Sequence, residues 1–177
     1  MILVVSTSLH PDSRSRIMAR YASSYLEDQA GRFHWLDLSD TPLPQCDGAG
    51  SYGHPAVAEV KLLVEQADGV LLAGPVYNYD FGSAAKNMIE LTGKAWTDKV
   101  VGIMCAAGSE VSYMAPMRIA SSLMLDFRSM ILPRFVFATG DKFNGQFISD
   151  AETAARIRDL VDQLLFVSGA LRPPDRS

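Results

Sequence analysis

Five short apolar runs alternate with five amphipathic stretches along most of the chain, and this alternation constrains the fold most strongly. The apolar runs cover residues 2–5, 33–38, 69–73, 99–106 and 130–138. Two segments, GVLLAG and VVGIMCAA, are continuously apolar, which is typical of strands covered on both faces. The segment FHWLDL alternates between apolar and polar residues and therefore indicates an edge strand. Strands that alternate with helices predict an α/β domain, a parallel sheet with helices on both faces.

The amphipathic stretches carry residues that begin or end helices. We expect helices over residues 14–29, 54–64, 83–92, 113–127 and 149–165. Pro55 stands in a first turn, where its missing N–H costs no hydrogen bond. Gly93 is a C-terminal stop, and Asp150 provides an N-cap for the last helix. Two long loops, residues 39–53 and 139–148, complete the prediction.

Length and composition indicate one ordinary domain. The chain has 177 residues, of which 48% are apolar and 20% are charged. We expect a single domain over residues 1–168 and a flexible tail over residues 169–177, where two consecutive prolines exclude a helix. A net charge of −4 gives no general attraction to nucleic acid or to anionic membranes. No apolar stretch approaches the roughly 20 residues of a membrane span, and no signal peptide is expected.

The two cysteines, Cys46 and Cys105, are too few and too far apart for a disulfide framework or a metal site. Cys46 falls in an expected loop and Cys105 near the end of an expected strand. We therefore expect two free thiols in a reducing compartment, which predicts a cytoplasmic protein without a metal.

The segment STSLHPDSRSR, residues 6–16, follows the first strand and runs directly into a helix. In open α/β sheets, ligands bind beyond the carboxyl ends of the strands, where the strand order reverses. A helix N-terminus offers free backbone N–H groups to a phosphate, and the serines of this loop add hydroxyl donors. The loop contains neither a Walker lysine motif nor a Gly-x-Gly-x-x-Gly pattern, so it favours a phosphomonoester. In the alternative interpretation, the serines only cap the helix.

Two further segments follow the third and fourth strands. The first, GPVYNYDFGSAAKNMIE, places Tyr77, Tyr79 and Phe81 in a loop, where their rings could cover a planar heterocycle. A hydrophobic plug or an oligomer contact is the alternative. The second, residues 105–110, is rich in Ala, Gly and Ser and would let the backbone approach a ligand closely. Small residues also follow many strands for steric reasons alone.

Together these segments resemble the NADPH-dependent FMN reductase family of flavodoxin-fold proteins, which includes quinone, azo-dye and chromate reductases. The resemblance extends from Met1 to about Leu165. TSLHPDSRSR matches a Gly-Ser-x-Arg-x-x-Ser-x-Asn or Ser loop, and PVYNYDFGSAAKNMIE matches Pro-x-Tyr-Asn-x-Ser-x-Pro-Gly-x-Leu-Lys-Asn-x-Ile-Asp. The resemblance implies a flavodoxin-like three-layer sandwich whose five-stranded parallel sheet has the order 2-1-3-4-5, with helices on both faces.

The resemblance also implies which residues hold FMN. The phosphate is assigned to Ser8, Ser13, Ser15 and Arg16, and His10 stands where an arginine is common. The ring edge is assigned to Pro75, Val76, Tyr77 and Asn78, with Tyr79 beside them. The pyrimidine side is assigned to Ala106, Gly108 and Ser109. No side chain is expected to act as a catalytic acid or base, because the N5 atom of the flavin carries the chemistry.

The second motif departs from the family pattern at Asp80, Gly82, Ser83 and Ala85, which replace the usual Ser, Pro, Gly and Leu. An unscreened carboxylate at position 80 would disfavour an anionic reduced flavin. These changes leave the strength of FMN binding open. Lys86 and Asn87 are expected to tie their helix to neighbouring loops and to have no catalytic role.

The function implied by the resemblance is an NAD(P)H-dependent oxidoreductase that passes electrons through FMN to a flavin, a quinone or a similar small acceptor. One alternative is a flavodoxin-like electron carrier without NAD(P)H activity, and another is a flavin-free module of the same fold. Family members are commonly dimers or tetramers, so we expect a homodimer or homotetramer. A stripe of Met114, Met117, Met124 and Leu125 is either its interface or part of the core.

Overall fold

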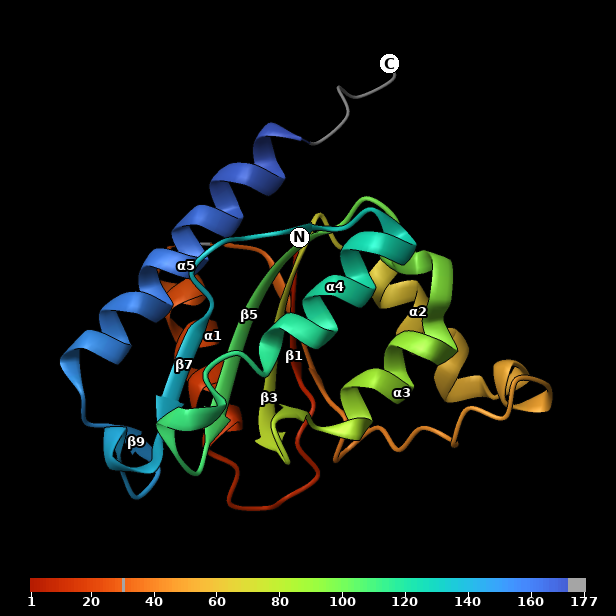
Figure 1. The fold of residues 1–177 in the computed structure, drawn as a ribbon. Helices are drawn as coiled ribbons and strands as arrows, with labels where there is room; N and C mark the ends of the chain where they lie inside the picture. Colours follow the sequence, from red (N-terminus) through yellow and green to blue (C-terminus); the bar gives the residue numbers. More distant parts are fainter. Residues whose placement is uncertain (30, 172–177) are drawn as a thin grey trace.

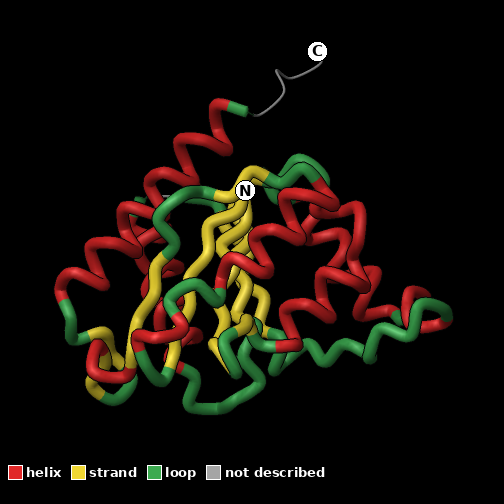
Figure 2. Tube along the Cα trace, in the orientation of Figure 1, coloured by secondary structure: helices red, strands yellow, loops and turns green. Residues whose placement is uncertain are grey.

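The computed structural model describes residues 1–29 and 31–171 and has a single central sheet between two layers of helices (Figures 1 and 2). One face of the sheet is covered by α1 (Arg14–Asp28) and α5 (Ala151–Ala170). The other face is covered by α2 (Pro55–Gln66), α3 (Ser83–Thr92) and α4 (Pro116–Phe127). This arrangement is the predicted three-layer sandwich. None of the helices in the described residues is long and apolar enough to cross a membrane.

The sheet is parallel along its main path. Its principal strands are β1 (Ile2–Ser6), β2 (Phe33–Asp37), β3 (Gly69–Tyr77), β5 (Val100–Ala107), β6 (Met130–Ile131) and β7 (Val136–Thr139). Their order is β2-β1-β3-β5, after which β6 and β7 both pair with β5. Counting β6 and β7 as one interrupted fifth strand gives the order 2-1-3-4-5, as predicted. The edge position expected for FHWLDL is also confirmed, because β2 lies at the end of this order.

The fifth apolar run does not form one continuous strand. Pro133 lacks a backbone N–H, and Arg134 has a left-handed conformation with φ 64°. Both features break the ladder between β6 and β7. The fourth helix also begins later than predicted, at Pro116, because residues 110–112 form a short 3-10 helix, η3 (Glu110–Ser112).

The long loops contain short regular elements that sequence patterns did not predict. The loop at 39–53 ends in η1 (Gly50–Gly53), and η2 (Gly93–Trp96) follows α3. The loop at 139–148 contains η4 (Gly140–Lys142) and a hairpin of β8 (Phe143–Asn144) and β9 (Phe147–Ile148). The last helix, α5, extends to Ala170 and so includes the first two residues assigned to the tail. Residues 172–177 of that tail lie outside the described residues.

Alternate residues of β1 pack into two hydrophobic cores, one on each face of the sheet. Leu3 and Val5 pack into the cluster beneath α2, α3 and α4, whereas Ile2 and Val4 pack into the cluster beneath α1 and α5. A central strand that is buried on both faces explains its continuous apolar sequence. The sheet therefore holds the carboxyl ends of β1, β3 and β5 rigidly side by side.

Several local predictions are confirmed. Pro55 occupies the first turn of α2, and Gly93 caps α3 with φ 47°. Asp150 caps α5 by accepting a hydrogen bond from the N–H of Thr153. Asn87 ties α3 to the loop at 39–53, because its amide donates to the carbonyl of Pro44 and accepts from the N–H of Cys46.

Candidate functional site

A pocket of about 240 Å³ lies where β1, β3 and β5 end, at the lower edge of the sheet in Figure 1. We call it the loop pocket. Its wall is formed by the loop between β1 and α1, the end of β3, and the end of β5 with the residue that follows. The lining residues are Ser8, His10, Asp12, Ser13, Arg14, Ser15, Pro75, Val76, Tyr77, Ala106, Ala107 and Gly108. The three segments singled out in the sequence thus meet around one cavity.

Four residues predicted for the site lie outside this wall: Arg16, Asn78, Tyr79 and Ser109. The wall also holds Asp12 and Arg14, to which the sequence analysis assigned no role, and Ala107, which lies within the segment 105–110 singled out there. Arg14 is the first residue of α1 and directly follows the N-cap, Ser13. A basic residue at the start of a helix that follows a hydroxyl-rich loop is a signal that could have identified it.

The buried serine hydroxyls of the loop pocket have more protons to donate than the described residues accept in hydrogen bonds. Ser8, Ser13 and Ser15 are at most 7% exposed. The Oγ of Ser8 accepts from the N–H of His10 at 3.3 Å, and the Oγ atoms of Ser13 and Ser15 lie 3.0 Å apart. Each hydroxyl carries one proton, and the Ser13–Ser15 bond uses only one of two. Within the described chain, two hydroxyl protons therefore have no acceptor, one from Ser8 and one from this pair.

The N-terminus of α1 opens onto the same pocket. Ser13 caps the helix, since its Oγ accepts from the N–H of Arg16 at 3.2 Å. The backbone N–H groups of Arg14 and Ser15 have no acceptor among the residues that the structure describes. Such free donors are expected in the first turn, and together with the helix dipole they favour an anion. Capping therefore accounts for Ser13 but leaves Ser8 and Ser15 without that role.

His10 shapes the loop through its own ring. Its Nδ1 accepts a hydrogen bond from the N–H of Asp12 at 3.0 Å. Because Nδ1 is the acceptor of this bond, Nε2 is the ring nitrogen left to donate a hydrogen bond. His10 lines the pocket and closes a turn of the loop.

The expected role of Arg16 as a direct phosphate donor is wrong. Its guanidinium is buried and forms an ion pair with Asp37, with Nε 2.6 Å from Oδ2. Its Nη1 donates to the carbonyls of His10 and Pro11, and its Nη2 donates to the carbonyl of Ser8 at 2.7 Å. Nη2 also reaches Ser39 and the second oxygen of Asp37. Every donor of Arg16 is used inside the protein, so this residue holds the loop in shape.

Burial raises the pKa of Asp37, but hydrogen bonds from Arg16 and Ser39 lower it by more. The net pKa of this carboxyl lies below its usual value. Asp37 therefore remains ionised at neutral pH and keeps its ion pair with Arg16. The charge of Asp37 also explains why Arg16 points away from the pocket.

The tyrosines after β3 stand on a tight hairpin. β3 pairs antiparallel with β4 (Asp80–Phe81) through Val76–Phe81 and Tyr77–Asp80. The two turn residues, Asn78 and Tyr79, both have left-handed backbones, with φ 50° and 63°. This is the pattern of a type I′ turn, which is costly for tyrosine. The hairpin presents Tyr77 to the pocket and carries Asn78 and Tyr79 at its tip.

The carboxylate of Asp80, a residue that departs from the family pattern, is bound by two groups of the protein. One carboxylate oxygen accepts from the N–H of Phe81 at 2.7 Å, and the other lies 3.2 Å from Nη1 of Arg118 on α4. The pair is exposed and so contributes little to stability. It nevertheless places a compensating charge beside Asp80.

Two glycines shape the walls of the pocket in different ways. A Cβ on Gly74 would lie 2.2 Å from the Phe81 ring and 2.5 Å from Oγ1 of Thr7, so the close packing of β3 and β4 requires glycine here. A Cβ on Gly108 would meet nothing within 4 Å. The space above Gly108 is open, which agrees with the expectation that a ligand can approach this backbone closely.

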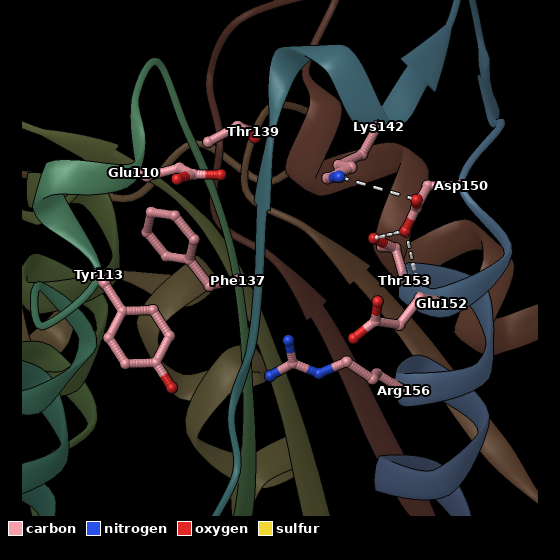
Figure 3. A pocket seen from close by; sticks show the side chains of 9 residues that line it. All are labelled: Glu110, Tyr113, Phe137, Thr139, Lys142, Asp150, Glu152, Thr153 and Arg156. Atoms are coloured by element: carbon pink, nitrogen blue, oxygen red, sulfur yellow. Dashed lines mark hydrogen bonds and ion pairs between the residues drawn. The ribbon is translucent and has the colours of Figure 1, made fainter.

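A second cavity of about 370 Å³ straddles β7 at the edge of the sheet, and we call it the edge pocket. Figure 3 shows Glu110 and Tyr113 on one side of β7, and Lys142, Glu152 and Arg156 on the other. Its remaining lining residues are Phe137, Thr139, Asp150 and Thr153. It therefore holds three carboxylates and two cations. No cluster of side chains suited to a metal ion occurs in the described parts of the chain.

The cations of the edge pocket are engaged by other groups of the protein. Nζ of Lys142 lies 3.7 Å from Asp150, which also accepts two hydrogen bonds from Thr153 at 2.7 Å (Figure 3). A hydrogen bond to Asp141 and the charge of Asp150 raise the pKa of Lys142. Arg156 donates to the carbonyl of Phe135 at 3.0 Å. The edge pocket is larger than the loop pocket, but its carboxylates outnumber its cations, and this disfavours an anion.

Comparison with solved structures shows the fold class of the chain. It superposes on the solved apo structure of an NADH:FMN oxidoreductase, EmoB, with a TM-score of 0.78 and 16% identity, over 98% of this chain and 91% of that one. A likeness at this identity shows the shared flavodoxin-like fold. The sequence profile of the NADPH-dependent FMN reductase family matches residues 1–144, and the chain belongs to this family.

Two characterised relatives match part of the chain. An NADPH azoreductase from Bacillus sp. (strain OY1-2) is 29% identical over 109 residues, which are 60% of this chain and 58% of that protein. An FMN reductase (NADPH) from Pseudomonas putida is 29% identical over 116 residues, or 64% and 58% of the two chains. The matched region thus spans less than two thirds of each relative.

Proposed function

We propose that this protein is an FMN-dependent NAD(P)H oxidoreductase that reduces a small-molecule acceptor. The observation that carries the proposal is the surplus of hydrogen-bond donors around the loop pocket. Two hydroxyl protons and the two backbone N–H groups at the N-terminus of α1 converge there, without acceptors among the described residues. A phosphate with several acceptor oxygens fits this set of donors. Family membership supports FMN as the source of this phosphate.

In this proposal the loop after β1 binds the FMN phosphate, with Ser8, Ser13 and Ser15 as hydroxyl donors and His10 closing the turn. The ends of β3 and β5 hold the ring, through Pro75, Val76 and Tyr77 on one side and Ala106 and Gly108 on the other. The open space above Gly108 and the exposed Tyr77 support this division. Asn78, Tyr79 and Ser109 border the ring from outside the described pocket wall.

FMN, when bound, supplies the redox chemistry by accepting hydride from NADPH or NADH and passing electrons onward. The side chains around the loop pocket bind and orient the cofactor. They include no buried pair of acid and base. The Arg118–Asp80 pair keeps the hairpin charge balanced beside the ring. We place flavins, quinones and azo compounds among the candidate acceptors, since one relative is named an azoreductase.

The alternative of an electron carrier without NAD(P)H activity is less well supported. Carriers of this fold dock on partner proteins through strongly acidic faces, whereas the net charge here is only −4. A flavin-free module would have no use for the donor surplus of the loop pocket.

We also propose that the protein is cytoplasmic and forms a homodimer or homotetramer. Cys46 and Cys105 are both free thiols, as expected in a reducing compartment. Met114, Met117, Met124 and Leu125 are 40–86% exposed, so the core interpretation of this stripe is wrong. An exposed apolar stripe of this kind favours self-association.

The proposal is tested with the absorption spectrum of the purified protein loaded with FMN, followed by anaerobic titration with NADPH and with NADH. We expect bound flavin bands that bleach on addition of at least one nucleotide. Reoxidation by a quinone or an azo dye then identifies the acceptor class. Protein that binds FMN but is not reduced by either nucleotide would support the carrier, and protein that binds no FMN would contradict the proposal.

A further inference from the structure

Among the described residues, Arg14 is the one arginine in the wall of the loop pocket. It begins α1, is exposed, and lines the pocket beside Ser13 and Ser15. Its side chain has no hydrogen bond or ion pair with any residue that the structure describes, whereas Arg16, two positions later, uses all its donors internally. The fold thus buries one arginine of this loop in an ion pair and leaves the other free at the cavity.

The position of the guanidinium is shaped by the loop after β7. A Cβ on Gly140 would lie 2.8 Å from Nη1 of Arg14 and 2.9 Å from Cζ. Gly140 therefore leaves the space that the guanidinium occupies. A segment that is distant in sequence thus limits where this side chain can lie.

The balance of charge shows why a free cation matters at this pocket. Asp12 also lines the wall, and Nδ1 of His10 accepts a hydrogen bond from the N–H of Asp12. Arg14 is thus the group that offsets the carboxylate of Asp12. Without it, the wall would carry a net negative charge toward a phosphate that itself carries nearly two.

We propose that Arg14 binds the FMN phosphate and supplies the positive charge of the site. The inference rests on the proposed function. A guanidinium at this place can donate two hydrogen bonds to phosphate oxygens, and the charge strengthens both. Arg16 then acts as a positioning residue that holds the loop.

The test compares FMN with riboflavin, which has the same ring and no phosphate. Both are titrated by flavin fluorescence into the wild-type protein and into Arg14→Gln. We expect the Kd for FMN to rise by about tenfold to a hundredfold, the range of a charge-assisted hydrogen bond. The Kd for riboflavin should change by less than about twofold, because a charge-assisted bond to phosphate is absent there.

Arg20→Gln is the matched control. Arg20 lies on the same helix but places its guanidinium 5.9 Å from the centre of the Trp35 ring, away from the loop pocket. This variant should bind FMN like the wild type.

Two further variants change the same pocket in opposite directions. Gly140→Ala should weaken FMN binding by displacing Arg14, and Asp12→Asn should strengthen it by about twofold to fivefold through loss of repulsion.

The outcomes separate the two proposals. Wild-type protein that binds FMN while Arg14→Gln binds it equally well contradicts the role of Arg14 and leaves the proposed function intact. A variant that loses FMN and riboflavin to the same degree also contradicts it, because the loss then does not concern the phosphate. A wild-type protein that binds neither ligand contradicts both proposals. Circular dichroism of Arg14→Gln confirms that the fold is retained.

Discussion

The loop pocket and the edge pocket both lie at the carboxyl end of the sheet, but they use their polar groups in opposite ways. In the edge pocket, Lys142 is held by two carboxylates and Arg156 by a backbone carbonyl. In the loop pocket, the hydroxyl proton of Ser8 and one of the two protons of the Ser13–Ser15 pair have no acceptor in the part of the chain that the structure describes. The smaller cavity thus has the greater capacity to bind an anion.

Neither the volume of a cavity nor the number of its charged side chains identifies a binding site in this protein. What matters is whether the donors are already satisfied by the protein. The buried Arg16–Asp37 ion pair stabilises the loop that forms the pocket, because Arg16 also donates hydrogen bonds to the backbone carbonyls of Ser8 and His10. We expect substitutions to act differently in three places. These are the Arg16–Asp37 ion pair that holds the loop, the donors of the loop pocket, and the paired charges of the edge pocket.

Arg16→Gln should have the largest effect. The change leaves Asp37 as a buried carboxylate without its ionic partner and releases the carbonyls of Ser8 and His10. We expect a loss of about 3–5 kcal/mol in the free energy of unfolding. Urea denaturation measures it. Arg14→Gln is the control and should stay within about 0.5 kcal/mol of the wild type; equal losses for the two arginines would remove the distinction drawn between them.

Gly74→Ala should have the next largest effect. The added methyl group would collide with the Phe81 ring and with Oγ1 of Thr7. We expect destabilisation by about 1–3 kcal/mol from overpacking, together with weaker flavin binding because the β3–β4 hairpin must shift. Gly108→Ala is the matched control, since its methyl group meets only open space. Thermal unfolding of both variants distinguishes packing from any general effect of losing a glycine.

Acid should weaken the Arg16–Asp37 ion pair that holds the loop. The folded-state pKa of Asp37 is lowered, so its stabilising contribution is present above the unfolded value of about 4 and is lost as the pH falls through the folded pKa. The free energy of unfolding of the wild type should therefore decline below about pH 4. In Asp37→Asn this part of the decline should be absent, and an unchanged pH profile would argue against a role for the pair.

Lys142→Gln should have the smallest effect. Its ion pairs with Asp141 and Asp150 are at least partly exposed to solvent. We expect a change of less than about 0.5 kcal/mol in stability and no more than about a twofold change in the Kd for FMN. A large loss of FMN affinity would show that the edge pocket, and not only the loop pocket, binds the cofactor.

Much of the fold could be predicted from the sequence because the apolar runs are continuous and well separated. The runs at 69–73 and 99–106 are the buried centres of β3 and β5. The break at Pro133 and Arg134 could not be located, since a proline can also stand at the edge of an intact strand. The β3–β4 hairpin was missed because its turn consists of Asn78 and Tyr79, without the glycine that usually indicates a type I′ turn.

The candidate site was predicted in position but not in the division of roles. Ser8, Ser13 and Ser15 could be placed at one site because they stand in the loop after β1, and all three line the loop pocket. The roles of Arg14 and Arg16 could not, because they depend on Asp37, which lies 21 residues from Arg16 along the chain. Only the pairing of β1 with β2 brings Asp37 beside the loop and decides which arginine is buried.

The loop pocket, in our proposal, binds the phosphate of FMN. The most direct measurement is the Kd of the wild-type protein for FMN and for riboflavin at low and at high salt. We predict that FMN binds at least about tenfold more tightly than riboflavin at low salt and that high salt narrows the difference, as expected for a charged contact. Equal affinities for the two flavins, or no binding of FMN, would contradict the claim.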